Sequence, residues 1–224
     1  MPFDKRRESK VIAVIEADVV AGSAKGRDGS LHAALERVNH LYLPALAEPF
    51  TLVAADRIDG ALPDPSRAPL CISVLRESLA PRLLRVGVGV GPAAGARDAA
   101  GESRDALSSA RRALQLTIRD DGLTRYVGTG EAGDVLLTAL CRLVDPLIRA
   151  RTAKQWEAIS AYRSLGHQRE VAARLGVTRQ SVGDRLGAGH YRAGEEADAA
   201  IATFLSHMSA CDSPTSEPLL CCEV

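Results

Sequence analysis

Aromatic residues and paired cysteines are scarce in this sequence. Phe, Trp and Tyr make up 4% of its 224 residues, so the core must be aliphatic, which favours helix-rich layers. The five cysteines are scattered and form no C-x-x-C pair, which argues against a disulfide framework or a zinc site and favours a reducing compartment. No apolar run reaches the roughly 18 residues of a membrane helix, so we expect a cytoplasmic protein without a membrane partner.

The sequence also lacks net charge, because 28 Lys and Arg residues balance 28 Asp and Glu residues. The balance hides a local asymmetry. Residues 151–192 contain eight basic and three acidic residues, whereas residues 193–224 contain six acidic residues and no basic one. Contact with DNA requires such a basic excess, because neutralising backbone phosphates releases condensed counterions. A solvated arginine-rich face would give the same count.

The first part of the chain predicts a β-α-β-β-α-β order. The expected elements are strands at 11–20, 50–56, 61–62 and 83–91 and helices at 31–41 and 66–79, with a turn at Asp59 and Gly60. This order is that of the ferredoxin-like split unit, an α+β sandwich. The glycines of residues 83–91 permit close approach by backbone or by a ligand. A helix at 103–118, a strand at 125–127 and a helix at 131–150 are expected to follow.

The clearest pattern lies in residues 152–208, which predict a helix-turn-helix DNA-binding domain. Gly166 and Gly176 end the first two helices, Ala172 is small where two helices cross, and Val177 and Thr178 fill and cap the turn. The candidate DNA-binding residues at the start of the recognition helix are Thr178, Arg179, Gln180, Ser181 and Arg185. A helical hairpin used only for packing or protein contact is the alternative. Gly183 and Asp184 weaken that helix and its contact with phosphates.

These patterns divide the chain into four parts. They are a ferredoxin-like domain (1–130), a connecting helix (131–151), the helix-turn-helix domain (152–208) and a disordered tail (209–224). A single motif covers too little DNA for the usual specificity, so we expect a homodimer on double-stranded DNA. The long helices predicted after Glu131 and after Glu195 are the candidate interfaces.

The whole plan resembles the SatD family, and the resemblance spans most of the chain. The family has an A-D-[IV]-V-x-[GS]-S segment, a G-D-E-F-Q-G-L hairpin, a G-[IV]-G-[IV]-G strand and a C-terminal helix-turn-helix. The corresponding segments are ADVVAGS at 17–23, ADRIDGA at 55–61 and GVGVG at 87–91. In the hairpin only Asp56 and Gly60 match the family pattern. The first domain also resembles the palm-type core of nucleotidyl cyclases, which implies that Asp18 and Asp56 hold a divalent cation, Mg²⁺ or Mn²⁺.

For this aspartate pair, a turn residue and a loop cap are the structural alternative. The chain has no phosphate-cradling Gly-Lys-Ser/Thr loop, no nucleophile constellation and no histidine pair at metal-site spacing, and Arg57 stands where a second carboxylate would help hold a cation. We therefore expect a DNA-binding regulator that senses a nucleotide or other small-molecule effector rather than an enzyme. A metal-dependent phosphoryl-transfer enzyme and a protein-binding adaptor are the other readings.

Overall fold

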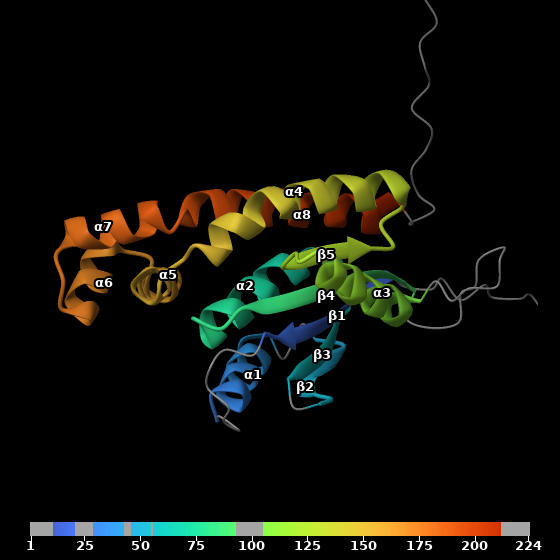
Figure 1. Ribbon diagram of the computed structural model, residues 1–224, viewed down its shortest axis with the longest axis horizontal. Helices are drawn as coiled ribbons and strands as arrows, with labels where there is room; N and C mark the ends of the chain where they lie inside the picture. The colour runs from blue at the N-terminus through green and yellow to red at the C-terminus, as the bar shows by residue number, and fades with distance from the viewer. Residues whose placement is uncertain (1–10, 21–28, 43–45, 55, 93–104, 212–224) are drawn as a thin grey trace, which may run out of the picture.

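The computed structural model describes residues 11–20, 29–42, 46–54, 56–92 and 105–211, in which strands and helices alternate before a run of helices (Figure 1). The strands are β1 (Val11–Val19), β2 (Glu48–Leu52), β3 (Arg57–Leu62), β4 (Leu84–Pro92) and β5 (Thr124–Val127). The helices are α1 (Gly29–Tyr42), α2 (Ala68–Leu79) with the short 3-10 helix η2 (Pro65–Arg67) before it, α3 (Ala106–Arg119), α4 (Glu131–Arg149), α5 (Ala153–Leu165), α6 (Gln168–Leu175), α7 (Arg179–Ala188) and α8 (Tyr191–Cys211). The described part is therefore α+β, as the sequence predicts.

Within the described residues, one mixed sheet contains all five strands, in the order β2-β3-β1-β4-β5. The central strand β1 pairs antiparallel with β3 and β4, whereas β5 joins β4 in parallel. A run of β-branched residues suits this position, because a central strand is buried on both faces. Side chains alternate between the faces: Ala13, Ile15 and Ala17 join the main core with α1 and α2, whereas Val14 packs with Ala106 of α3.

Two glycines of β4 allow α3 to lie directly on the sheet. A Cβ atom at Gly89 would stand 1.9 Å from the Ala106 carbonyl oxygen, and one at Gly87 would stand 2.2 Å from the Leu114 nitrogen. The sequence leaves open whether a backbone or a ligand approaches this strand. At these two positions the space is taken by the α3 backbone, so the glycines have a packing role.

The hairpin between β2 and β3 differs from the prediction. The turn predicted at Asp59 and Gly60 is wrong, because both residues lie inside β3 and the chain reverses between residues 52 and 57. Gly60 is needed for another reason, since a Cβ atom there would stand 2.6 Å from the Phe50 ring. Phe50 is 1% exposed and belongs to the main hydrophobic core, at the edge of the sheet formed by β2. The glycine therefore marks an aromatic contact across two strands.

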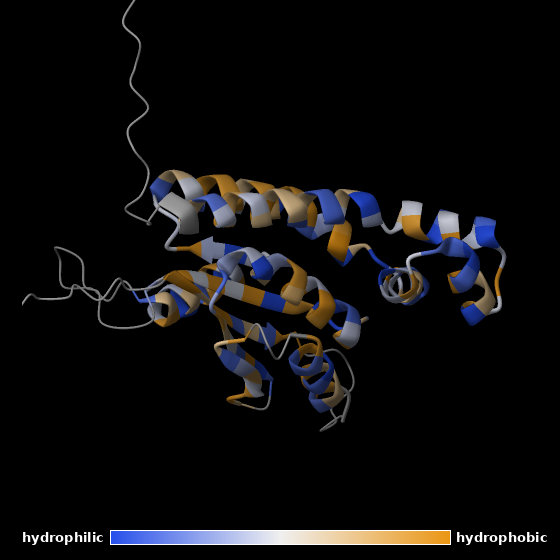
Figure 2. Ribbon diagram, turned by 180° about the vertical axis from the view of Figure 1, so that it is seen from behind, coloured by the Kyte–Doolittle hydropathy of each residue, from blue (hydrophilic) through white to orange (hydrophobic). Residues whose placement is uncertain are grey.

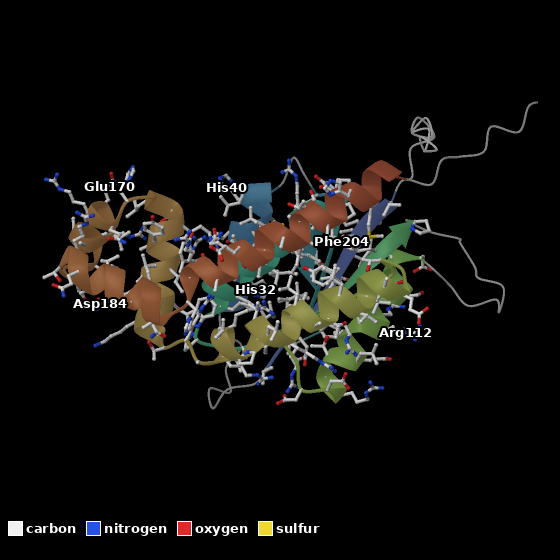
Figure 3. The ribbon with its side chains drawn as sticks, turned by 90° about the horizontal axis from the view of Figure 1, so that it is seen from above. His32, His40, Arg112, Glu170, Asp184 and Phe204 are labelled. Atoms are coloured by element: carbon white, nitrogen blue, oxygen red, sulfur yellow. The ribbon has the colours of Figure 1, made fainter. Side chains whose placement is uncertain are left out.

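Helices α4 and α8 run side by side along one side of the molecule (Figures 1 and 3). Leu137 and Cys141 of α4 and Ile201 and Leu205 of α8 belong to the same hydrophobic core as the sheet. Figure 2 shows hydrophobic colours along the strands and these two helices, and more hydrophilic colours around α5 to α7. The long last helix is therefore part of the sheet's core as well as the continuation of α7.

The last helix is also longer than predicted. It begins at Tyr191 rather than Glu195 and ends at Cys211, so residues 209–211 of the predicted tail are helical. The rest of that tail, residues 212–224, lies outside the described residues. In the part of the chain that the structure describes, no helix has the length and apolar character needed to cross a membrane.

Candidate functional site

Helices α5, α6 and α7 form a three-helix unit with a hydrophobic cluster of its own. Its buried side chains are Ala158, Ile159, Ala161, Val171, Ala172, Val182 and Leu186. The unit begins with a reciprocal cap: the Gln155 backbone N–H donates to the Thr152 hydroxyl, and the Thr152 N–H donates to the Gln155 side chain. Helix α5 ends at Gly166, whose φ of +77° is left-handed and therefore favours glycine.

The turn between α6 and α7 has the local geometry that the sequence predicts. Gly176 adopts a left-handed φ of 64°, which reverses the chain after α6. The Val177 N–H then donates to the Ala172 carbonyl over 3.1 Å, which satisfies an end carbonyl of α6. The Thr178 hydroxyl caps α7 by accepting a hydrogen bond of 3.1 Å from the Ser181 N–H.

The first turn of α7 is open to solvent. Arg179 and Gln180 are exposed, whereas Val182 and Leu186 face inward, as expected. Asp184 follows Gln180 one turn later on the exposed side, and Figure 3 shows it at the outer end of the three-helix unit. The accessible surface of α7 therefore combines an arginine and a glutamine with one carboxylate.

Two of the predicted contact residues are less accessible than the sequence suggests. Ser181 is half-buried and its N–H is held by the Thr178 cap. Arg185 turns toward α5, where its Nη1 lies 3.4 Å from Glu157 Oε2 and its side chain is 18% exposed. The predicted outward direction of Arg185 is wrong, because a carboxylate on the neighbouring helix attracts the guanidinium.

Several basic residues of the segment 151–192 have structural partners. Arg151 donates to the Gly189 carbonyl over 2.7 Å and lies 4.8 Å above the Trp156 ring. Among the described residues, Lys154, Arg169 and Arg179 are exposed and make no ion pair. The basic excess counted from the sequence therefore overstates the charge that is free to meet phosphates.

Arg163 connects the three-helix unit to the sheet's core. Its Nε lies 2.6 Å from Glu77 Oε1 on α2, and its Nη2 lies 2.7 Å from Glu195 Oε1 on α8. Burial raises the pKa of Glu77, and the Arg163 charge opposes that rise. No signal in the sequence points to this contact, because Arg163 and Glu77 are 86 residues apart.

A second buried acid lies close to this junction. Burial raises the pKa of Asp198 on α8 to about 6, although Ser73 Oγ donates to its carboxylate over 2.5 Å. Asp198 borders a cavity of about 30 Å³ together with Arg76, Tyr126 and Asp145. A carboxylic acid in this position is therefore more easily protonated than one in water.

Asp18 and Asp56 lie at one end of the sheet. Asp18 is near the end of β1, and Asp56 precedes β3, where its carbonyl accepts from the Val19 N–H over 2.9 Å. Burial, and then the charge of Asp56, raise the pKa of Asp18, while Arg57 and Arg85 oppose that rise. The rest of the first family-like segment, residues 21–23, lies outside the described residues.

The donor set around this aspartate pair is small. Among the described residues, no three His, Cys, Asp or Glu side chains are grouped to hold a metal ion. Hard cations take about six oxygen ligands, so two carboxylates leave most positions to water or to phosphate oxygens. The pair can supply carboxylate oxygens to a cation that a phosphate-bearing ligand also holds, with Arg57 close enough to attract an anion. Arg85 is also near Asp18, but its guanidinium pairs with Asp121 over 2.7 Å.

Comparison with known proteins gives little further information. No protein-family model and no curated protein sequence matches the chain. Among solved structures, it is similar to the crystal structure of a regulator of polyketide synthase expression from Bifidobacterium adolescentis, with 14% identity and a TM-score of 0.29 over 90% of this chain and 80% of that chain. A likeness at that score supports no argument about fold or function.

Proposed function

We propose that this chain is a DNA-binding transcription regulator of the SatD type. In this proposal α6, its turn and α7 form a helix-turn-helix, and α7 enters the major groove. The observation that carries it is the exposed first turn of α7, where Arg179 and Gln180 follow the Thr178 cap. This turn belongs to the end of the molecule away from the sheet (Figure 1), so a duplex has access to it.

The side chains at this turn suit direct readout of bases. Arginine pairs in bidentate fashion with guanine and glutamine with adenine, and both need the helix N-terminus close to the base edges. Lys154 and Arg169 lie in the helices before α7 and are exposed, which suits phosphate contacts that set the register. Arg185 would contact DNA only after leaving Glu157.

Binding of duplex DNA to point variants tests this proposal. Arg179→Ala and Gln180→Ala should each weaken target preference by about 1–3 kcal/mol if the contact is bidentate. Asp184→Asn should strengthen binding, because it removes a negative charge near the phosphates. Arg67→Ala is the charge-matched control, since Arg67 is exposed on η2 and pairs with Asp64. Unchanged target preference in both α7 variants would exclude this helix as the reading element.

The proposed domain division follows from the same argument. Residues 1–130 would form a ferredoxin-like sensor domain, 131–151 a connecting helix and 152–208 the DNA-binding domain. The order β2-β3-β1-β4, with β1 antiparallel to both neighbours, supports the ferredoxin-like class. Because Ile201 and Leu205 lie in the core of the first domain, α8 would carry any movement of that domain to the end of α7.

A second candidate function rests on the closeness of Asp18 and Asp56. The raised pKa of Asp18 reflects repulsion by Asp56 as well as burial, and a divalent cation would relieve both. Mg²⁺ or Mn²⁺ held by the two carboxylates would also bind the phosphates of a nucleotide. That nucleotide would be an effector in a sensor and the substrate of phosphoryl transfer in an enzyme.

Calorimetric titration of ATP and of GTP with Mn²⁺, with and without DNA, separates these readings. A sensor requires reciprocity: if the nucleotide strengthens DNA binding, DNA must strengthen nucleotide binding by the same factor. Asp18→Asn with Asp56→Asn should remove that coupling and leave basal DNA affinity intact, with Asp64→Asn as the control. Nucleotide turnover that disappears in the double variant would favour the enzyme, and absence of binding would leave the aspartates structural.

A further inference from the structure

The outer face of α4 is apolar although it is exposed. Val135, Leu136 and Leu143 are 66%, 56% and 73% exposed, and they are the most exposed large apolar side chains on any described helix. The opposite face of the same helix, with Leu137 and Cys141, packs in the sheet's core. A surface helix needs only one apolar face to bind its own core, so the second face indicates a partner.

The exposed residues follow a coiled-coil spacing. Ala132, Leu136, Ala139 and Leu143 are all exposed, and they are separated by four, three and four positions. This is the alternation of d and a positions in a heptad repeat. The small residues stand at the d positions and the leucines at the a positions. Two such helices can approach closely if each leucine packs against an alanine of the other.

An antiparallel arrangement achieves that packing with a second copy of α4. Core layers of antiparallel pairs join a positions to d positions, so Leu143 would meet the partner's Ala132 and Leu136 the partner's Ala139. The same register brings Arg142 within one turn of the partner's Glu131. Arg142 is 64% exposed and lies 3.3 Å from Asp120 of its own chain, so its guanidinium would be shared between the two carboxylates. In a parallel, in-register pair Arg142 and the partner's Glu131 would lie 11 positions apart along the axis, so their attraction favours the antiparallel form.

The face does not end at the helix. A groove of about 660 Å³ between α3, β5 and α4 is lined by Leu116 and Val127 as well as by Val135 and Leu143. Charged side chains border the same groove, namely Arg112, Arg125, Asp134 and Arg142. A helix pair alone is small against the roughly 1,200–2,000 Å² that stable interfaces bury, and the groove extends the apolar surface beyond α4. A two-fold pair would use this surface twice.

We propose that the chain forms a two-fold homodimer through this face, which we call the α4 seam (Ala132, Val135, Leu136, Ala139, Leu143). The homodimer itself does not depend on DNA binding.

The consequence of this dimer for DNA rests on the proposed function. The two-fold axis lies near the middle of α4, and α5 begins shortly after that helix ends. With a rise of about 1.5 Å per residue, the two α4 C-termini lie about 35 Å apart. The two α7 helices lie beyond those ends (Figure 1), which predicts half-sites more than one helical turn apart.

Sedimentation equilibrium of the full chain tests the α4 seam. The wild type should be dimeric, and Leu143→Glu should raise the dimer dissociation constant at least about 30-fold, because the two-fold axis places the new carboxylate in the seam twice. Leu41→Glu is the matched control, because Leu41 is a helical leucine of similar exposure, 54%, on α1. It should leave the dimer unchanged, and circular dichroism should show that both variants are folded.

A charge reversal tests the antiparallel register. Arg142→Glu should weaken the dimer by placing two acidic residues together, and adding Glu131→Arg should restore it. A wild-type monomer at every concentration, or a Leu143→Glu variant as dimeric as the Leu41→Glu control, would overturn the proposal. A Leu143→Glu variant that is folded and monomeric would support the dimer whether or not α7 reads DNA. A wild-type chain that forms the dimer but does not bind duplex DNA would count against the proposed function and leave the α4 seam in place.

Discussion

Replacing Gly89 with alanine should be among the most damaging single changes in the chain. Gly89 lies on β4 beneath α3, and the new Cβ atom would stand 1.9 Å from the Ala106 carbonyl oxygen and 2.2 Å from the Ala110 nitrogen. Ordinary contacts begin near 3.4 Å, so α3 would have to withdraw by about 1.5 Å. Because both neighbours are backbone atoms, no side-chain rotation can relieve the overlap.

The expected loss is about 3 kcal/mol or more in the free energy of unfolding. Overpacking a well-packed core costs about 1–3 kcal/mol, and a displaced α3 also loses the buried contacts of Ala106 and Ala110. Glycine in a strand loses more conformational entropy on folding than alanine, which is worth about 0.5–1 kcal/mol in favour of alanine and offsets only part of the loss.

Urea unfolding followed by circular dichroism measures this effect, with Gly183→Ala as the matched control. A Cβ atom at Gly183 would meet nothing closer than the Gln168 side chain at 3.8 Å, so alanine in this helix interior should stabilise by up to about 1 kcal/mol. The same substitution should therefore have opposite signs at the two positions. A Gly89→Ala midpoint equal to the wild-type midpoint would refute the backbone packing of α3 on β4.

Three further changes test the buried polar contacts. The raised pKa of Asp198, about 6, means that the folded state binds a proton more tightly, so stability should fall as the pH rises from about 4 to 6. Asp198→Asn should make this dependence shallower and stabilise the protein at pH 7 by up to about 3 kcal/mol, and a pH profile equal to that of the wild type would contradict it. Arg163→Met should cost about 3–5 kcal/mol at neutral pH by leaving Glu77 buried and unpaired, less at acidic pH, and adding Glu77→Leu should recover part of the loss in urea unfolding. Asn39→Ala should cost about 1–3 kcal/mol in the same assay, because the Asn39 side chain bonds both the N–H and the carbonyl of Phe50, and a change no larger than that of the neighbouring His40→Ala would argue against this role.

Local chemistry explains which parts of the fold were predictable. The β-branched run of β1 and the helical periodicity of α4 are properties of short windows, and the structure has those elements within a residue or two of the expected positions. The turn before α7 is equally local, because a glycine with positive φ and a threonine cap act within a few residues. The hairpin turn was misplaced because the role of Gly60 depends on the Phe50 ring from the neighbouring strand.

Contacts between distant residues explain what sequence alone missed at the candidate site. Arg185 reads as an outward residue on its own helix, but Glu157 of α5 draws it inward. Arg163 reads as one of many basic residues, but it is fixed by Glu77 and Glu195. Both pairings depend on how helices are packed, which no local pattern encodes. The exposed face of α4 likewise becomes visible only once the opposite face is known to be buried.

The central claim, that α7 reads duplex DNA, is tested most directly by selection from a pool of random duplexes. The full chain should enrich one motif as paired half-sites, with affinity that falls steeply as salt increases. Selection with Arg179→Ala and with Gln180→Ala should lose preference at one or two positions of each half-site, whereas Arg67→Ala should recover the wild-type motif. Failure of the wild type to enrich any motif at low salt, or an identical motif from all four proteins, would contradict the account.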